Sequence, residues 1–148
     1  MDGLSAAASV LGVIGACLAT AKFVDDARTK YKHAPHTLTS VRSEIQAVSA
    51  SLAVIQNLLL QGKESQLNII LENANVLPAF NTTLEGCAST ISFIQFETKN
   101  LIVESLDQGI NRIDKVKVAR MTDTFNTLLG NLRGQHAALV PLIQLLQL

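Results

Sequence analysis

The 148-residue sequence predicts an all-α protein, an up-and-down four-helix bundle with one additional short helix, folded as a single domain over residues 1–148. Apolar residues make up 48% of the chain but aromatic residues only 4%, a composition typical of helices packed on helices. Apolar residues recur at spacings of three and four along four long segments. Short links between such segments favour antiparallel neighbours that cross at about 20°.

The first segment, Gly3 to Ala21, is a run of 19 residues without a charge, bounded by Asp2 and Lys22. As a helix it would be about 28 Å long, close to the roughly 30 Å of a bilayer's hydrocarbon core. Its strongly apolar residues contribute only about −2 to −4 kcal/mol of transfer free energy, so it lies near break-even between membrane and water. They are Leu4, Val10, Leu11, Val13, Ile14 and Leu18.

Two faces of this segment follow helical spacing, and we expect the resting bundle to hide the more apolar one. Three interpretations stay open: a core helix only, a core helix that also inserts into lipid, and a targeting signal. The absence of Lys and Arg upstream disfavours the last. The small-residue face is Ser5, Ala8, Gly12, Gly15 and Ala19, and the more apolar face is Leu4, Ala7, Leu11, Ile14, Leu18 and Ala21.

The helix is predicted to continue to about Lys30 as a charged amphipathic segment, and Pro35 marks a turn. Its apolar stripe there is Phe23, Val24, Ala27 and Tyr31. The second helix has the clearest pattern, ends at Gly62, and is expected to be buried on more than one side at Asn57–Leu60. Its predicted seam is Leu38, Val41, Ile45, Val48, Leu52, Ile55 and Leu59.

Residues 66–77 predict the additional short helix, and Pro78 suits the first turn of the next long one. Phe93 and Phe96 lie off that helix's seam, so they pack on a neighbouring segment or form an interface. The last helix starts near Ile110, and Pro141 should kink or restart it. The two predicted seams are Leu77, Phe80, Leu84, Cys87, Ile91, Ile94, Thr98 and Leu101, and then Val118, Met121, Phe125, Leu128, Leu132, His136, Leu139, Ile143 and Leu146.

No catalytic or metal-binding pattern is apparent, so we expect neither an enzyme nor a cofactor. Cys17 and Cys87 both lie in apolar helical patterns, which indicates small core residues in a reducing compartment. We interpret His136 as a satisfied core or boundary histidine. The net charge is zero and the basic residues are not interleaved with exposed aromatic ones, which excludes a nucleic-acid partner. Association with a membrane or with protein remains.

The opening MDGLSAAASVLGVIG resembles the N-terminal domain of fungal STAND (NOD-like receptor) proteins, of the HeLo-like group. A basic KYKHAP segment, the Leu/Val-rich second helix and the closing LLGNLRGQHAALVPLIQLLQL agree, so the resemblance spans essentially the whole chain. It implies a bundle related to that of mammalian necroptosis executioners and a role in fungal programmed cell death, as in heterokaryon incompatibility. Two features differ, because no amyloid signalling motif and no nucleotide-binding or repeat domain accompany this sequence. The apolar end LIQLLQL indicates the N-terminal domain of a longer protein.

The resemblance implies a cytoplasmic protein that homo-oligomerises through neighbouring domains, relocates to the plasma membrane and inserts its first helix. The rival interpretation is an oligomerisation or interaction module that never contacts lipid and uses the LIQLLQL end or the two phenylalanines. The inserting residues would be Leu4, Ala8, Leu11, Gly12, Ile14, Gly15 and Leu18. Anionic lipid would meet Lys22, Arg28, Lys30, Lys32 and Arg42, and a protein interface would use Phe93 and Phe96.

Overall fold

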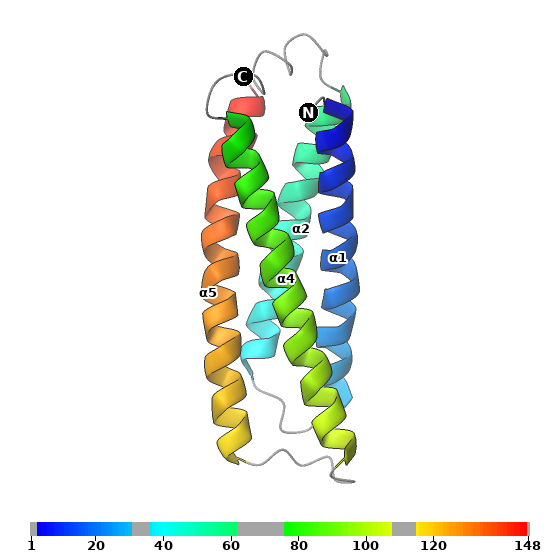
Figure 1. Cartoon of the computed structure of the whole chain (residues 1–148), viewed down its shortest axis with the longest axis vertical. Helices are drawn as coiled ribbons and strands as arrows, with labels where there is room; N and C mark the ends of the chain where they lie inside the picture. Colours follow the sequence, from blue (N-terminus) through cyan, green and yellow to red (C-terminus); the bar gives the residue numbers. More distant parts are fainter. Residues whose placement is uncertain (1–2, 31–35, 62–75, 108–114, 148) are drawn as a thin grey trace.

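The computed structural model describes residues 3–30, 36–61, 76–107 and 115–147, which form four long helices and, within those ranges, no strand. They confirm the predicted all-α bundle (Figure 1). The predicted short helix over residues 66–77 lies outside the described residues, except for its last two, which belong to the third long helix. The helices are α1 (Gly3–Lys30), α2 (Thr37–Gln61), α4 (Val76–Asp107) and α5 (Lys115–Leu146).

Successive helices reverse direction, as predicted, but not every successive pair is adjacent (Figure 1). α1 packs on α2 and α4, and α5 packs on the same two helices, so α2 and α4 lie on a diagonal of the bundle. As a result α1 and α4 run in the same direction side by side, as do α2 and α5. The up-and-down direction is therefore as predicted, but the expectation that linked helices are neighbours is wrong for α2 and α4. The chain between Gln61 and Val76 is long enough to cross the end of the bundle.

The core follows the predicted seams of three helices closely. All the predicted seam positions of α2 are buried, and so are those of α4 apart from half-buried Leu77. On α5 the buried residues are Phe125, Leu128, Leu129, Leu132 and Leu139. Deep burial of long aliphatic side chains, each contributing on the order of 1.5–3 kcal/mol, holds these helices together.

Two local predictions are wrong. Leu60 is 61% exposed. It follows the seam residue Leu59 directly, so its side chain points about 100° round the helix from the buried side. The prediction of a kink or restart at Pro141 is wrong as to the restart, because α5 continues through Pro141 to Leu146. Pro141 and Ala137, whose carbonyl loses its helical partner, are both exposed residues. Beyond Pro141 the backbone N–H of Gln147 still donates to the carbonyl of Ile143 at 3.1 Å.

Candidate functional site

The buried stripe of α1 follows a different line from either of the two predicted faces. The prediction that the resting bundle hides the more apolar face is wrong at Leu11 and Leu18, whereas Ala7 of that face is buried and Ile14 and Ala21 pack against the core. Val24 and Ala27, which were predicted from the charged half of the helix, set this buried stripe, and it continues toward the N-terminus at the same spacing. The stripe is Ala6, Val10, Val13, Cys17, Thr20, Val24 and Ala27, all less than one tenth exposed.

The face of α1 that points away from the bundle is apolar and uncharged. Leu11 and Leu18, one heptad apart, are 60% and 63% exposed. Between and beside them lie exposed Ala8, Gly12 and Gly15 of the predicted small-residue face. Ile14 is half-buried and packs against the core, and the side chain of Leu4 lies outside the described residues. Most of the predicted inserting residues thus share one outward surface, which we call the outer face of α1 (Ala8, Leu11, Gly12, Gly15, Leu18).

The glycines of this face have open space where a side chain would be. A Cβ atom added at Gly12 or Gly15 would meet nothing within 4 Å, and the same holds for Gly130 and Gly134 on α5. All four positions therefore accept larger residues without disturbing the core. The two α5 glycines provide matched controls for substitutions on α1.

A shallow groove of about 290 Å³ separates the outer face of α1 from α2. On α1 it is lined by Cys17, Leu18 and Ala21, and on α2 it is lined mainly by small residues. No charged side chain lines it. The exposed apolar surface of α1 therefore continues onto α2. The α2 residues are Ile45, Gln46, Ser49, Ala50 and Ala53.

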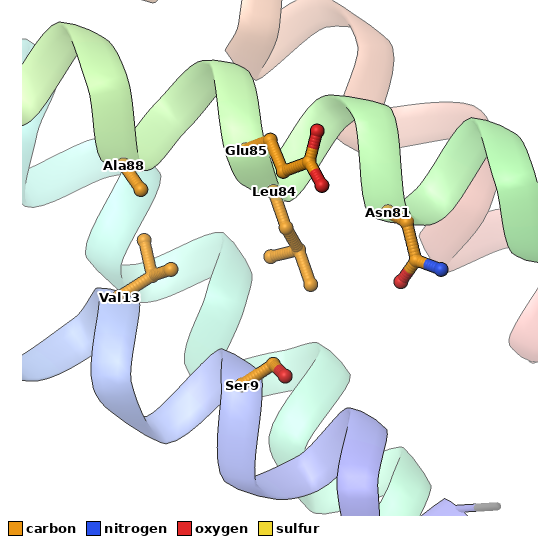
Figure 2. Close-up of a pocket in the computed structure, with 6 residues that line it drawn as sticks. All are labelled: Ser9, Val13, Asn81, Leu84, Glu85 and Ala88. Carbon is orange, nitrogen blue, oxygen red and sulfur yellow. The ribbon is translucent and has the colours of Figure 1, made fainter. Parts of the chain in front are cut away.

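On its other side α1 leaves an open cavity of about 240 Å³ against α4 (Figure 2). Ser9 and Val13 of α1 face α4 there, and Leu84 projects from α4 toward α1 (Figure 2). Because side chains fill this junction incompletely, the N-terminal half of α1 is held less tightly on α4 than a close-packed helix would be. The α4 residues of the lining are Asn81, Leu84, Glu85 and Ala88.

Two of the predicted lipid-binding arginines are engaged within the bundle. Arg42 at the start of α2 forms an ion pair with Asp25 of α1, and Arg28 lies 3.8 Å from the same carboxylate. Their charge is therefore partly neutralised. Lys22 is exposed at the end of the uncharged run, whereas Lys32 and the side chain of Lys30 lie outside the described residues. On its α4 side, half-buried Phe23 carries the ammonium of Lys99 at 5.1 Å from its ring centre, a cation–π contact.

Of the features assigned to the rival interpretation, one is exposed and the other is not. Phe93 and Phe96 on α4 are 57% and 59% exposed, so most of each ring faces outward. The LIQLLQL end is instead turned inward, because Leu142, Ile143 and Leu146 pack against the core. These three side chains therefore serve the core of the bundle and offer little apolar surface for docking.

A polar cluster that sequence reasoning missed joins α2 to α5. His136 lies between Glu44 and Ser51. Because the carboxylate only accepts, Nδ1–H of His136 donates to Glu44 Oε1 at 2.8 Å, and Nε2 is hydrogen-bonded to the Ser51 hydroxyl at 3.1 Å. Arg133 Nε lies 3.9 Å from the other Glu44 oxygen. We call these four residues the α2–α5 clasp.

The clasp has the residue types of a Ser–His–acid triad, but its setting indicates a structural role. Ser51 lies in the middle of α2, where each backbone N–H is bonded to the carbonyl four residues earlier. The amides beside Ser51 are therefore engaged and not directed at an oxyanion. The prediction of a satisfied boundary histidine is confirmed, since His136 is half-buried and both ring nitrogens have partners.

α1 buries a thiol, Cys17, and a hydroxyl, Thr20. Cys17 and its α4 counterpart Cys87 are free thiols with no exposed surface. Burial raises the pKa of Cys17 to about 12, with a smaller contribution from Cys87, and raises the pKa of Cys87 to about 11. Both are therefore inert protonated core residues near neutral pH. Thr20 is also fully buried, and among the described residues its hydroxyl has no hydrogen-bond partner, which weakens the attachment of α1.

Two of the described helices are long and apolar enough to cross a membrane, over Ala6–Thr29 and over Thr37–Gln61. Length and composition alone support this, and a core helix of a soluble protein can meet the same criterion. Comparisons with protein-family models, with curated proteins and with solved structures found no match for the chain.

Proposed function

We propose that this chain is a membrane-targeting effector domain of the HeLo-like, cell-death type, which oligomerises and then inserts α1 into a bilayer. The observation that carries the proposal is the outer face of α1. Leu11 and Leu18 are mostly exposed on a helix with no charge for 19 residues, so apolar surface already faces outward in the monomer. The resemblance of the opening residues to fungal STAND proteins supports the cell-death context.

The transfer free energy of α1 explains why clustering is needed. About −2 to −4 kcal/mol from its apolar residues must offset the loss of its buried stripe in the bundle. Raising the local concentration of the domain lets the small residues of neighbouring α1 helices pack closely in lipid, which supplies the missing free energy. Lys22, at the end of the uncharged run, would then meet anionic head groups at about 1 kcal/mol near the surface.

Dye release from anionic liposomes tests the proposal directly, with the domain clustered through an added oligomerising segment. Clustered protein should release dye. Gly12→Leu and Gly15→Leu should reduce release because they remove the small surface where copies approach. Gly130→Leu and Gly134→Leu make the same change at equally open sites on α5 and should leave release intact. Absence of release from the parent, or equal release by all four variants, would contradict the proposal.

The exposure of Phe93 and Phe96 favours one alternative, a protein-interaction module that never contacts lipid. Exposed aromatic pairs are enriched at protein interfaces. Light scattering separates the two functions. A stable dimer that Phe93→Ser and Phe96→Ser convert to monomer, and that is indifferent to liposomes, would favour the alternative.

A further inference from the structure

α1 and its neighbour α2 are the two described helices that could cross a membrane, and they pack directly on each other. α2 has its own uncharged run, Ile45–Gln61, of 17 residues. Such a run is about 25 Å long as a helix, compared with about 28 Å for the run in α1. The bundle therefore holds two uncharged rods of similar length side by side.

The end of the uncharged run in α1 and the start of the uncharged run in α2 lie at the same level of the bundle. Ala21, the last residue of the run in α1, lines the same groove as Gln46 and Ser49 near the start of the run in α2. The two helices are antiparallel, so from that level both runs extend toward the end of the bundle that holds the N-terminus (Figure 1). Outward apolar side chains occur on both, as Leu11 and Leu18 on α1 and Val54 and Leu60 on α2.

The charged residues of α1 and α2 all lie at the opposite end of these two helices. They are Lys22, Asp25, Asp26, Arg28 and Lys30 on α1, and Arg42 and Glu44 on α2. From Lys22 to Glu44 the chain has five basic and three acidic residues, a net charge of +2. This arrangement, an uncharged length with a basic end, matches a bilayer that has a hydrocarbon interior and anionic head groups.

We propose that the unit which enters lipid is the α1–α2 hairpin as a whole, and not α1 alone. This inference rests on the proposed function and specifies the moving part. The Asp25–Arg42 ion pair joins the two helices at their basic end and stays intact when they leave together. Gln46 and Ser49 are polar residues of α2 that line the groove against α1. If the two helices move together, α1 still covers these residues and they do not face hydrocarbon directly.

Departure of the hairpin breaks two interfaces, α1 with α4 and α2 with α5. The first is incompletely filled at the cavity of Figure 2. The second contains the α2–α5 clasp, so the clasp becomes the polar contact that retains the hairpin in the resting bundle. If α1 left alone, the clasp would stay closed and the α1–α2 interface would open instead. The two routes therefore open different interfaces.

Three covalent bridges distinguish the routes, each made by a short bifunctional maleimide in a Cys17→Ala, Cys87→Ala background. Ala21→Cys with Ser49→Cys bridges α1 to α2 across their groove. Ser51→Cys with His136→Cys bridges α2 to α5 where the side chains touch. Ser9→Cys with Asn81→Cys bridges α1 to α4 across the cavity of Figure 2. Each bridged protein is compared with its own thiol-capped, unbridged form in the liposome assay.

Hairpin entry predicts that the α1–α2 bridge leaves dye release intact, while the α2–α5 and α1–α4 bridges abolish it. Release that survives the α2–α5 bridge but is lost with the α1–α2 bridge means that α1 moves alone. That result overturns the hairpin and leaves the proposed function standing. Loss with all three bridges means that the helices separate individually, and retention with all three means that none leaves; both overturn the hairpin. A capped, clustered protein that releases no dye refutes the proposed function, and the hairpin inference with it.

Discussion

A single aspartate at Gly15 should separate folding from membrane entry. Gly15 lies on the outer face of α1, and an added Cβ there would meet nothing within 4 Å. Asp is at least as favourable as Gly inside a helix, so the free energy of unfolding should change by no more than about 0.5 kcal/mol. In lipid the same carboxylate near the middle of the run costs about 2.5–3.5 kcal/mol. At about 1.4 kcal/mol for each factor of ten, insertion should fall roughly 60- to 300-fold.

The assay is dye release from anionic liposomes by clustered protein, with circular dichroism in urea as the check on folding. Gly134→Asp is the control, because it makes the same change at an equally open, exposed position on α5. It should release dye as the parent does. If folded Gly15→Asp released dye at the parent's rate, α1 would not be entering hydrocarbon, and the reasoning from its outer face would be refuted.

Three further predictions concern the bundle itself. Thr20→Val should stabilise the fold by about 1–3 kcal/mol in urea titrations, because it removes a buried hydroxyl without a partner; a loss of stability would show that the hydroxyl is bonded. His136→Ala should destabilise by about 1–3 kcal/mol, and a double-mutant cycle with Ser51→Ala should show coupling, since the two are hydrogen-bonded; additive effects would refute the clasp. Because the raised thiol pKa values favour the folded state below about pH 9, stability should fall between about pH 9 and 12, and Cys17→Ala with Cys87→Ala should flatten that fall; an unchanged profile would contradict it.

The sequence predicted α2 and α4 well because polar residues mark which side of each helix faces water. The α2 seam from Leu38 to Leu59 is buried at every predicted position. A helix with polar residues on three sides has only one arrangement that buries its apolar residues, so periodicity alone determines the face. The structure also confirms the predicted start and end of α1, although not the whole of its predicted buried face.

The buried face of α1 was mispredicted because its first 19 residues carry no charge that could identify the outer side. Three stripes at helical spacing then compete, and side-chain size favoured the one with Leu11 and Leu18. The decisive signal lay further along, where Asp25, Asp26 and Arg28 leave Val24 and Ala27 as the inward positions. Stepping back from these two residues by threes and fours gives the stripe that the structure buries.

The α2–α5 clasp and the diagonal link could not be predicted for a different reason. Glu44 and His136 are far apart in the chain, and they meet only because α2 and α5 are neighbours that run the same way. Periodicity shows which residues face inward but not which helix each one faces. The direction of a link across the end of a bundle depends on packing among all four helices, which no local pattern encodes.

The diagonal placement of α2 and α4 divides the bundle into two halves, each formed from consecutive helices. Contacts inside a half close short loops and form early in folding, whereas contacts between the halves close longer loops and form later. Exchange of amide hydrogens for deuterium should therefore report two cooperative blocks, Gly3–Gln61 and Val76–Leu146, with the seam between them the first to open. The chain's connectivity thus sets where this protein comes apart.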